Sequence, residues 1–197
     1  MNMLELVHDL TVVLVGGISA IAALACSYLL ALTLGSRRPR APRIAAPALR
    51  FAVVVPAHDE ACGIADTVTS LRALDWPQDR FSVTVVADNC SDDTAARALS
   101  VGALVLERHD TSLRGKGYAL AYAFDRLMQE GWADAMVVID ADTRADANLL
   151  SALAVRISAG EQVLQAHYGV LNPSASWRTR LMTIALSAFH TVRSRGR

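Results

Sequence analysis

Lysine is almost absent from this sequence. A single lysine, Lys116, stands against 18 arginines, and the formal net charge of the 197-residue chain is zero. A balanced charge excludes the strong positive field with which many proteins attract nucleic acid, so we expect no nucleic-acid partner. Where arginine supplies nearly every cation, one lysine indicates a position that needs a compact point charge.

Cysteine is also scarce. The chain has three cysteines, Cys26, Cys62 and Cys90, and they are widely separated in the sequence. An odd number without regular spacing excludes the disulfide framework of a small secreted domain. The cysteine content therefore favours a reducing compartment.

Charged residues are missing from Leu10 to Ser36, a run of 27 residues rich in Val, Leu, Ala and Ile. About 20 residues span the hydrocarbon core of a bilayer. A cleaved signal peptide would begin with positive charge and have a shorter apolar core, whereas this N-terminus carries Glu5 and Asp9. A buried core helix would be shorter and carry a polar stripe. The run predicts one transmembrane helix over residues 10–36, after a short N-terminal segment, residues 1–9.

Arginines cluster directly after this run, at Arg37, Arg38, Arg40, Arg43 and Arg50. The positive-inside rule then predicts a single-pass protein of the cytoplasmic (inner) cell membrane, with everything downstream in the cytoplasm. Residues 37–48 also contain two prolines. They are expected to form a linker along the anionic membrane surface.

Apolar, β-branched runs alternate with helical patterns beyond residue 49. This alternation predicts an α/β domain over residues 49–176, with a mostly parallel sheet covered by helices on both faces. Residues 177–197 are predicted to form an amphipathic helix, which lies either at the membrane interface or against a partner segment. The expected strands are 50–56, 81–87, 103–107, 135–139 and 163–168, and the expected helices are 64–74, 94–100, 116–129 and 148–158.

Polar clusters follow the expected strands, where open parallel sheets bind their ligands. Asp140 and Asp142 flank one residue at a strand end and can hold a hard divalent ion. Such a pair is also common in solvated turns. Asp88 can accept a hydrogen bond from a pyrimidine N–H, and the Asn89 amide can donate and accept, although both are also typical of turns. Lys116 lies between two glycines at the expected start of a helix. Glycine lets the backbone come close to a phosphate and a helix N-terminus binds anions, so this segment is a candidate anion site.

Two nucleotide-binding classes are disfavoured because their glycine motifs are missing. No glycine-rich turn follows the first strand, as a dinucleotide-binding Rossmann domain requires, and the chain has no P-loop. A nucleotidyltransferase would need a glycine-rich, arginine-containing loop after the first strand. The sequence there, Pro56-Ala57-His58, is different.

Four segments together resemble the donor-site motifs of the family-2 glycosyltransferases, in the cellulose-synthase-like superfamily: VVVPAHDE, VVADNCSDDTA, RGKGYALAYA and VVIDADT. The resemblance covers residues 49–197 and implies the GT-A fold. It implies that Asp88 binds the base, that Lys116 lies near the phosphates, and that Asp142, with Asp140, ligates Mn²⁺ or Mg²⁺. The donor-binding residues expected from the motifs are Pro56, Ala57, His58, Glu60, Asp88, Asn89, Lys116 and Asp140.

The resemblance implies inverting transfer of a sugar from a nucleoside-diphosphate donor, a UDP-sugar, to an acceptor at the cytoplasmic membrane face. His58-Asp59 departs from the Tyr-Asn usual before Glu. No catalytic base is identified, because Glu161 is the only carboxylate after Asp146 and comes too early. The base is expected beyond Arg197, so the chain is predicted to be truncated at its C-terminus. The alternative is a membrane module that binds nucleotide sugar without transferring it.

Overall fold

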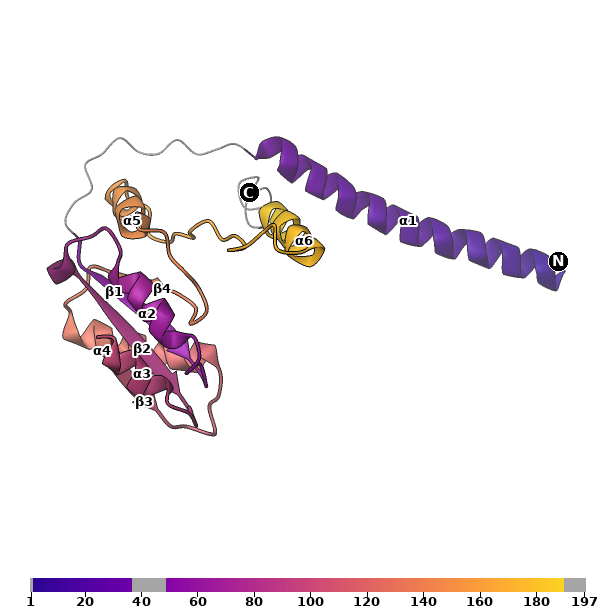
Figure 1. The fold of residues 1–197 in the computed structure, drawn as a ribbon. Coiled ribbons are helices and arrows are strands. Elements are labelled where there is room, and N and C mark those ends of the chain that lie inside the picture. Colours follow the sequence, from indigo (N-terminus) through magenta and orange to yellow (C-terminus); the bar gives the residue numbers. More distant parts are fainter. Residues whose placement is uncertain (1, 37–48, 190–197) are drawn as a thin grey trace. The chain divides into compact units, whose positions relative to one another are not determined.

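The structure, a computed structural model, describes residues 2–36 and 49–189 of the chain (Figure 1). Residues 49–164 form one compact unit, and residues 2–36 and 165–189 belong to a second. The predicted linker, residues 37–48, and residues 190–197 of the predicted C-terminal helix lie outside the described residues.

Helices and strands alternate along the first compact unit, as the sequence predicts. The elements in chain order are α1 (Met3–Gly35), β1 (Phe51–Ala57), α2 (Ile64–Arg72), η1 (Gln78–Arg80), β2 (Phe81–Asp88), α3 (Thr94–Ser100), β3 (Leu104–Arg108), α4 (Lys116–Glu130), β4 (Ala135–Val138), α5 (Leu149–Ser158) and α6 (Trp177–Leu186).

Helix α1 is the long apolar helix expected at the N-terminus. Its segment Glu5–Gly35 has a mean hydropathy of 2.2 and is long and apolar enough to cross a membrane. The helix begins at Met3 rather than near residue 10. The backbone N–H of Asn2 donates to Glu5 Oε2 at 2.9 Å, so polar residues form the first turn of the same helix.

The four strands of the sheet are all parallel, in the order β3-β2-β1-β4. Strand β1 lies between β2 and β4, and Phe51 pairs with Phe81 on one side and Ala135 on the other. Six of its seven residues are buried, and Pro56 is partly buried. A central parallel strand covered on both faces reads as a continuous apolar run, which is the pattern of its sequence.

Alternate residues of β1 face opposite sides of the sheet. Phe51, Val53 and Val55 pack in a cluster with apolar residues of α2, α3 and α5. Ala52 and Val54 pack in a second cluster with residues of α4. Helices therefore cover both faces, which confirms the predicted α/β arrangement.

An ion pair fixes the starts of β1 and β4. Asp134 accepts hydrogen bonds from the backbone N–H of Arg50 at 2.8 Å and from its Nη2 at 3.2 Å. These bonds from Arg50 lower the pKa of the Asp134 carboxyl. The pair lies at the N-terminal edge of the sheet, opposite the edge where the strands end.

The predicted strand over residues 163–168 is wrong. This segment has no regular secondary structure, and the Val163 side chain is 93% exposed. Within the described residues no strand follows β4 in the sheet. An apolar segment becomes a strand only where a neighbouring strand pairs with its backbone, and the local pattern does not supply one.

Thr84, in the middle of β2, has a buried hydroxyl. Its side chain is 1% exposed, and its Oγ1 has no hydrogen-bond partner within the described part of the chain. A buried hydroxyl without a partner destabilises the folded state, because its hydrogen bonds to water are lost.

We expect Thr84→Val to raise the free energy of unfolding by about 1 kcal/mol, because valine keeps the shape and removes the hydroxyl. Urea titration of the full chain in detergent measures this change. Thr84→Ser, which keeps the hydroxyl and removes the methyl group, is expected to be less stable than the wild type. A valine variant no more stable than the wild type would contradict the prediction.

Candidate functional site

The predicted site residues gather where the parallel strands end. Parallel strands end at the same edge of a sheet, and β1, β2 and β4 are paired in register. Pro56 and Ala57 end β1, His58 and Glu60 lie in the next loop, Asp88 ends β2 and Asn89 follows it, Lys116 begins α4, and Asp140 and Asp142 follow β4.

His58 joins the loop after β1 to the end of β2. Its Nδ1 lies 2.7 Å from the backbone carbonyl oxygen of Asp88. A carbonyl oxygen only accepts hydrogen bonds, so Nδ1 carries the proton. Glu60 is fixed through its backbone N–H, which donates to Thr94 Oγ1 at 2.8 Å. The structure thus brings His58 and Asp88 into contact, while their roles toward a nucleotide stay predictions.

The Asp88 carboxylate lies in a buried ion pair with Arg108. Both side chains are 9% exposed, and Arg108 Nη1 donates to Asp88 Oδ1 at 2.7 Å. Arg108 ends β3 opposite Asp88 in the strand register. A buried pair of this kind requires good geometry, because both charges have lost their water. Arg108 could not be predicted from the sequence, since an arginine at a strand end belongs to no motif.

Asn89 uses both ends of its amide inside the protein. Its Nδ2 donates to Asp88 Oδ1 at 3.0 Å, and its Oδ1 accepts the backbone N–H of Asp110 at 2.8 Å. Its backbone is left-handed, with φ of 53°, and its N–H donates to the Arg108 carbonyl. The pKa of Asp110 is lowered, first by the hydrogen bond from the Leu113 backbone. Asn89 therefore supports the Asp88 carboxylate.

Lys116 and Asp140 form an ion pair, although they are 24 residues apart. The two side chains are about half exposed, at 53% and 48%. Lys116 is the first residue of α4, and Gly115 before it has φ of 114°, which favours glycine. The pair places the only lysine of the sequence beside the first predicted metal ligand. An exposed ion pair adds little stability, so breaking it costs little free energy. Lys116 and Asp140 are therefore both available to a ligand.

The Asp140-Ala141-Asp142 turn is anchored by its middle residue. Ala141 is 5% exposed, and its carbonyl accepts a hydrogen bond from the buried hydroxyl of Thr67 at 2.5 Å. The Asp142 side chain is exposed and Asp140 is partly exposed. Two accessible carboxylates supply the oxygen ligands that Mn²⁺ and Mg²⁺ prefer, so these residues fit a divalent ion.

We expect Thr67→Val to lower the free energy of unfolding by about 1–3 kcal/mol, because the buried Ala141 carbonyl loses its partner. Urea titration of the full chain in detergent measures the loss. Thr67→Ser keeps the donor and is expected to lose less. The same chemical change, threonine to valine, should therefore have opposite effects at positions 67 and 84. A Thr67→Val variant as stable as Thr67→Ser would contradict this assignment.

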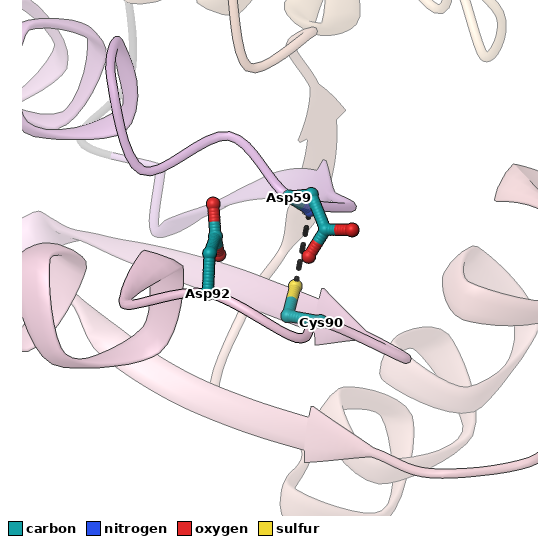
Figure 2. A group of neighbouring side chains, drawn as sticks. All are labelled: Asp59, Cys90 and Asp92. Carbon is teal, nitrogen blue, oxygen red and sulfur yellow. Dashed lines mark hydrogen bonds between the residues drawn. The ribbon is translucent and has the colours of Figure 1, made fainter.

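A second group of acidic and sulfur ligands lies at the same edge. Asp59, Cys90 and Asp92 each offer one ligand atom, and these atoms lie within 4.8 Å of one another (Figure 2). The group is a candidate metal-binding group that was not predicted from the sequence. Its members come from the first two motif segments, so the signal was present but their proximity was not visible.

Protein hydrogen bonds already engage these two carboxylates. Asp59 Oδ1 accepts the backbone N–H of Ser91 at 2.6 Å, and Asp92 Oδ2 accepts that of Ala61 at 3.0 Å. The loops after β1 and β2 are thereby joined. The pKa of Asp92 is lowered mainly by the Thr94 hydroxyl, and burial raises the pKa of the Cys90 thiol.

Asp92 also caps the start of helix α3. Its Oδ1 accepts the backbone N–H of Thr94, the first residue of the helix, at 2.9 Å. Asp93 occupies the cap position itself without a side-chain cap bond. A carboxylate at this end also interacts favourably with the helix dipole.

Glu161 is the only carboxylate after Asp146 in the sequence. It follows α5, and its Oε1 accepts a hydrogen bond from Arg156 Nη1 at 2.8 Å. This ion pair gives Glu161 a structural partner, and its exclusion as the catalytic base stays a prediction.

Comparisons with known proteins agree on one class. The sequence model of the family "Glycosyl transferase family 2" matches residues 52–195. The probable glycosyltransferase YdaM of Bacillus subtilis is 26% identical over 156 residues, which are 75% of this chain and 36% of that protein. The low-salt glycan biosynthesis hexosyltransferase Agl6 of Haloferax volcanii is 33% identical over 111 residues, 56% of this chain and 25% of that protein.

A solved structure shares the fold. The mannosyltransferase PcManGT of Pyrobaculum calidifontis, solved in complex with GDP-Man and Mn²⁺, superposes with a TM-score of 0.61 at 20% identity. The match covers 84% of this chain and 48% of that one. The chain therefore belongs to glycosyl transferase family 2, a family of enzymes, and has its GT-A fold. It spans about a third of the length of one curated relative and a quarter of the other.

Proposed function

We propose that this chain carries the donor-binding half of an inverting glycosyltransferase that uses a UDP-sugar at the cytoplasmic face of the membrane. The proposal rests on one observation: three chemically different groups lie at the same edge of the sheet. These are the base-reading carboxylate Asp88, the cation Lys116 and the exposed carboxylates Asp140 and Asp142. A nucleoside-diphosphate sugar needs contacts of these three kinds.

Asp88 supports the choice of base. Its carboxylate is buried at the end of β2 and can only accept hydrogen bonds when ionised. The ring N–H of uracil is a donor of the required kind. His58 holds the backbone of Asp88 and Asn89 holds its side chain, so the acceptor is fixed before a ligand arrives.

Lys116 and the aspartates support binding of the pyrophosphate. Lys116 begins α4, where unpaired backbone N–H groups and the helix dipole also favour an anion. The lysine pairs with Asp140, and a phosphate oxygen would compete for it. A divalent ion held by Asp140 and Asp142 would, when bound, neutralise charge on the departing nucleoside diphosphate.

The proposed reaction is a single displacement at the anomeric carbon. An acceptor hydroxyl oxygen forms the new glycosidic bond, the bond to the nucleoside diphosphate breaks, and the hydroxyl proton passes to a base. Attack from the face opposite the leaving group inverts the anomeric configuration. We assign no residue of this chain as the base, because Glu161 is paired with Arg156.

The membrane assignment is supported by α1 and by the arginines that follow it. The helix is long and apolar enough to cross a bilayer, and Arg37, Arg38 and Arg40 come directly after it. Positive charge retained on the cytoplasmic side would keep the GT-A domain there, where nucleotide sugars are available.

We expect UDP to bind the full chain in detergent about tenfold or more tightly with Mn²⁺ or Mg²⁺ than with a chelator. Asp142→Asn should remove that dependence, because it deletes a charged oxygen ligand while keeping the shape. Isothermal titration calorimetry measures both affinities. Asp125→Asn, a change at an exposed position in α4, is the control and should keep the dependence. Equal wild-type affinity with and without metal would count against the metal site.

We expect protease added to sealed inverted membrane vesicles, whose cytoplasmic face is outward, to digest residues 51–189. The same region should be protected in right-side-out vesicles, because the arginines after α1 retain it in the cytoplasm. Immunoblotting of a C-terminal tag reports the digestion, and detergent-opened vesicles are the control. Digestion from the extracytoplasmic side alone would refute the proposed topology.

A further inference from the structure

The two oxygens of the Asp88 carboxylate have different surroundings. Oδ1 accepts two hydrogen bonds, from Arg108 Nη1 at 2.7 Å and from Asn89 Nδ2 at 3.0 Å. Within the described part of the chain, Oδ2 accepts none. Most of the negative charge on Oδ1 is therefore compensated by a cation and an amide donor, whereas Oδ2 keeps its lone pairs for a ligand.

Arg108 also fixes the loop that leads to Lys116. Its Nη2 donates to Asp110 Oδ2 at 3.1 Å and to the Leu113 carbonyl at 2.8 Å. One guanidinium group thus contacts Asp88 on β2 and the segment directly before the α4 N-terminus. Lysine, with one ammonium group, cannot reproduce this planar arrangement of two donor nitrogens.

Uracil, guanine and cytosine make different demands on a carboxylate. Uracil presents one ring N–H between two carbonyl oxygens, so it needs one acceptor and is repelled by a second negative oxygen nearby. Guanine presents two adjacent N–H donors and pairs best with both carboxylate oxygens. Cytosine has a lone pair in place of the ring N–H. Specificity is the difference between these affinities.

We propose that Arg108 is a positioning residue that sets base specificity: by covering Oδ1, it leaves Asp88 a single acceptor that matches uracil and disfavours guanine and cytosine. The inference rests on the proposed use of a nucleoside-diphosphate donor. It assigns a function to a residue at the end of β3 that contacts the base only through Asp88.

The first test uses the unaltered full chain in detergent with Mg²⁺. Calorimetric affinities are compared for UDP, N3-methyl-UDP, CDP and GDP, which share the diphosphate and differ in the base. We expect UDP to bind about tenfold or more tightly than each of the other three, the difference typical of one hydrogen bond to a charged group. GDP or N3-methyl-UDP binding as tightly as UDP would overturn the proposal.

The second test replaces the guanidinium. Arg108→Lys keeps the positive charge but frees part of Oδ1, so we expect the ratio of UDP to GDP affinity to fall about tenfold. A purely structural role would weaken both nucleotides by the same factor, and that result would overturn the proposal. Arg50→Lys is the matched control, because it alters the Arg50–Asp134 pair at the opposite edge of the sheet and should leave the ratio unchanged.

The two proposals fail in different ways. If no diphosphate nucleotide binds the unaltered chain, with or without metal, the proposed function itself is wrong. If UDP and GDP bind equally and both depend on metal, the use of a nucleoside-diphosphate donor stands, whereas the choice of uracil and the role of Arg108 are wrong. Both outcomes are measured on the unaltered chain, so they can be distinguished even if Arg108→Lys does not fold.

Discussion

A parallel strand that is covered on both faces has little room for charged side chains except at its ends, and β1, at the centre of the sheet, is such a strand. Its residues are buried against α4 on one face and against α2, α3 and α5 on the other. The groups proposed to bind the donor therefore lie at the C-terminal edge, next to the loops. The chemistry of the site follows from the burial of the strand.

Charge at this edge is arranged in pairs at two depths. Asp88 and Arg108 are almost fully buried, and their partners fix one geometry before any ligand arrives. Lys116 and Asp140 are half exposed and can exchange partners at little cost. Under the proposed function, the preorganised pair would contact the base and the exposed pair the phosphates, so the selective part of the site is rigid and the part that releases the leaving group is adaptable.

The sequence predicted best those elements that have a long apolar run or a clear helical pattern. The runs of β1 and β2 and the helical pattern of α4 predicted their elements within one or two residues. The segment 163–168 also contains several apolar residues but has no pairing strand among the described residues, and the prediction failed there. Arg108 and Thr67 were missed for a related reason, because their roles depend on contacts with residues 20 and 74 positions away. Local patterns do not contain that information.

The hydrogen bond between His58 and the Asp88 carbonyl has a consequence for the imidazole ring itself. Since Nδ1 must hold a proton, the neutral ring has a fixed polarity, with its donor directed inward and the Nε2 lone pair left as an acceptor. The Asp59 carboxylate lies 3.9 Å from Nε2. A carboxylate oxygen accepts hydrogen bonds and does not donate them to a lone pair, so Nε2 faces outward as an acceptor for a donor group of a ligand.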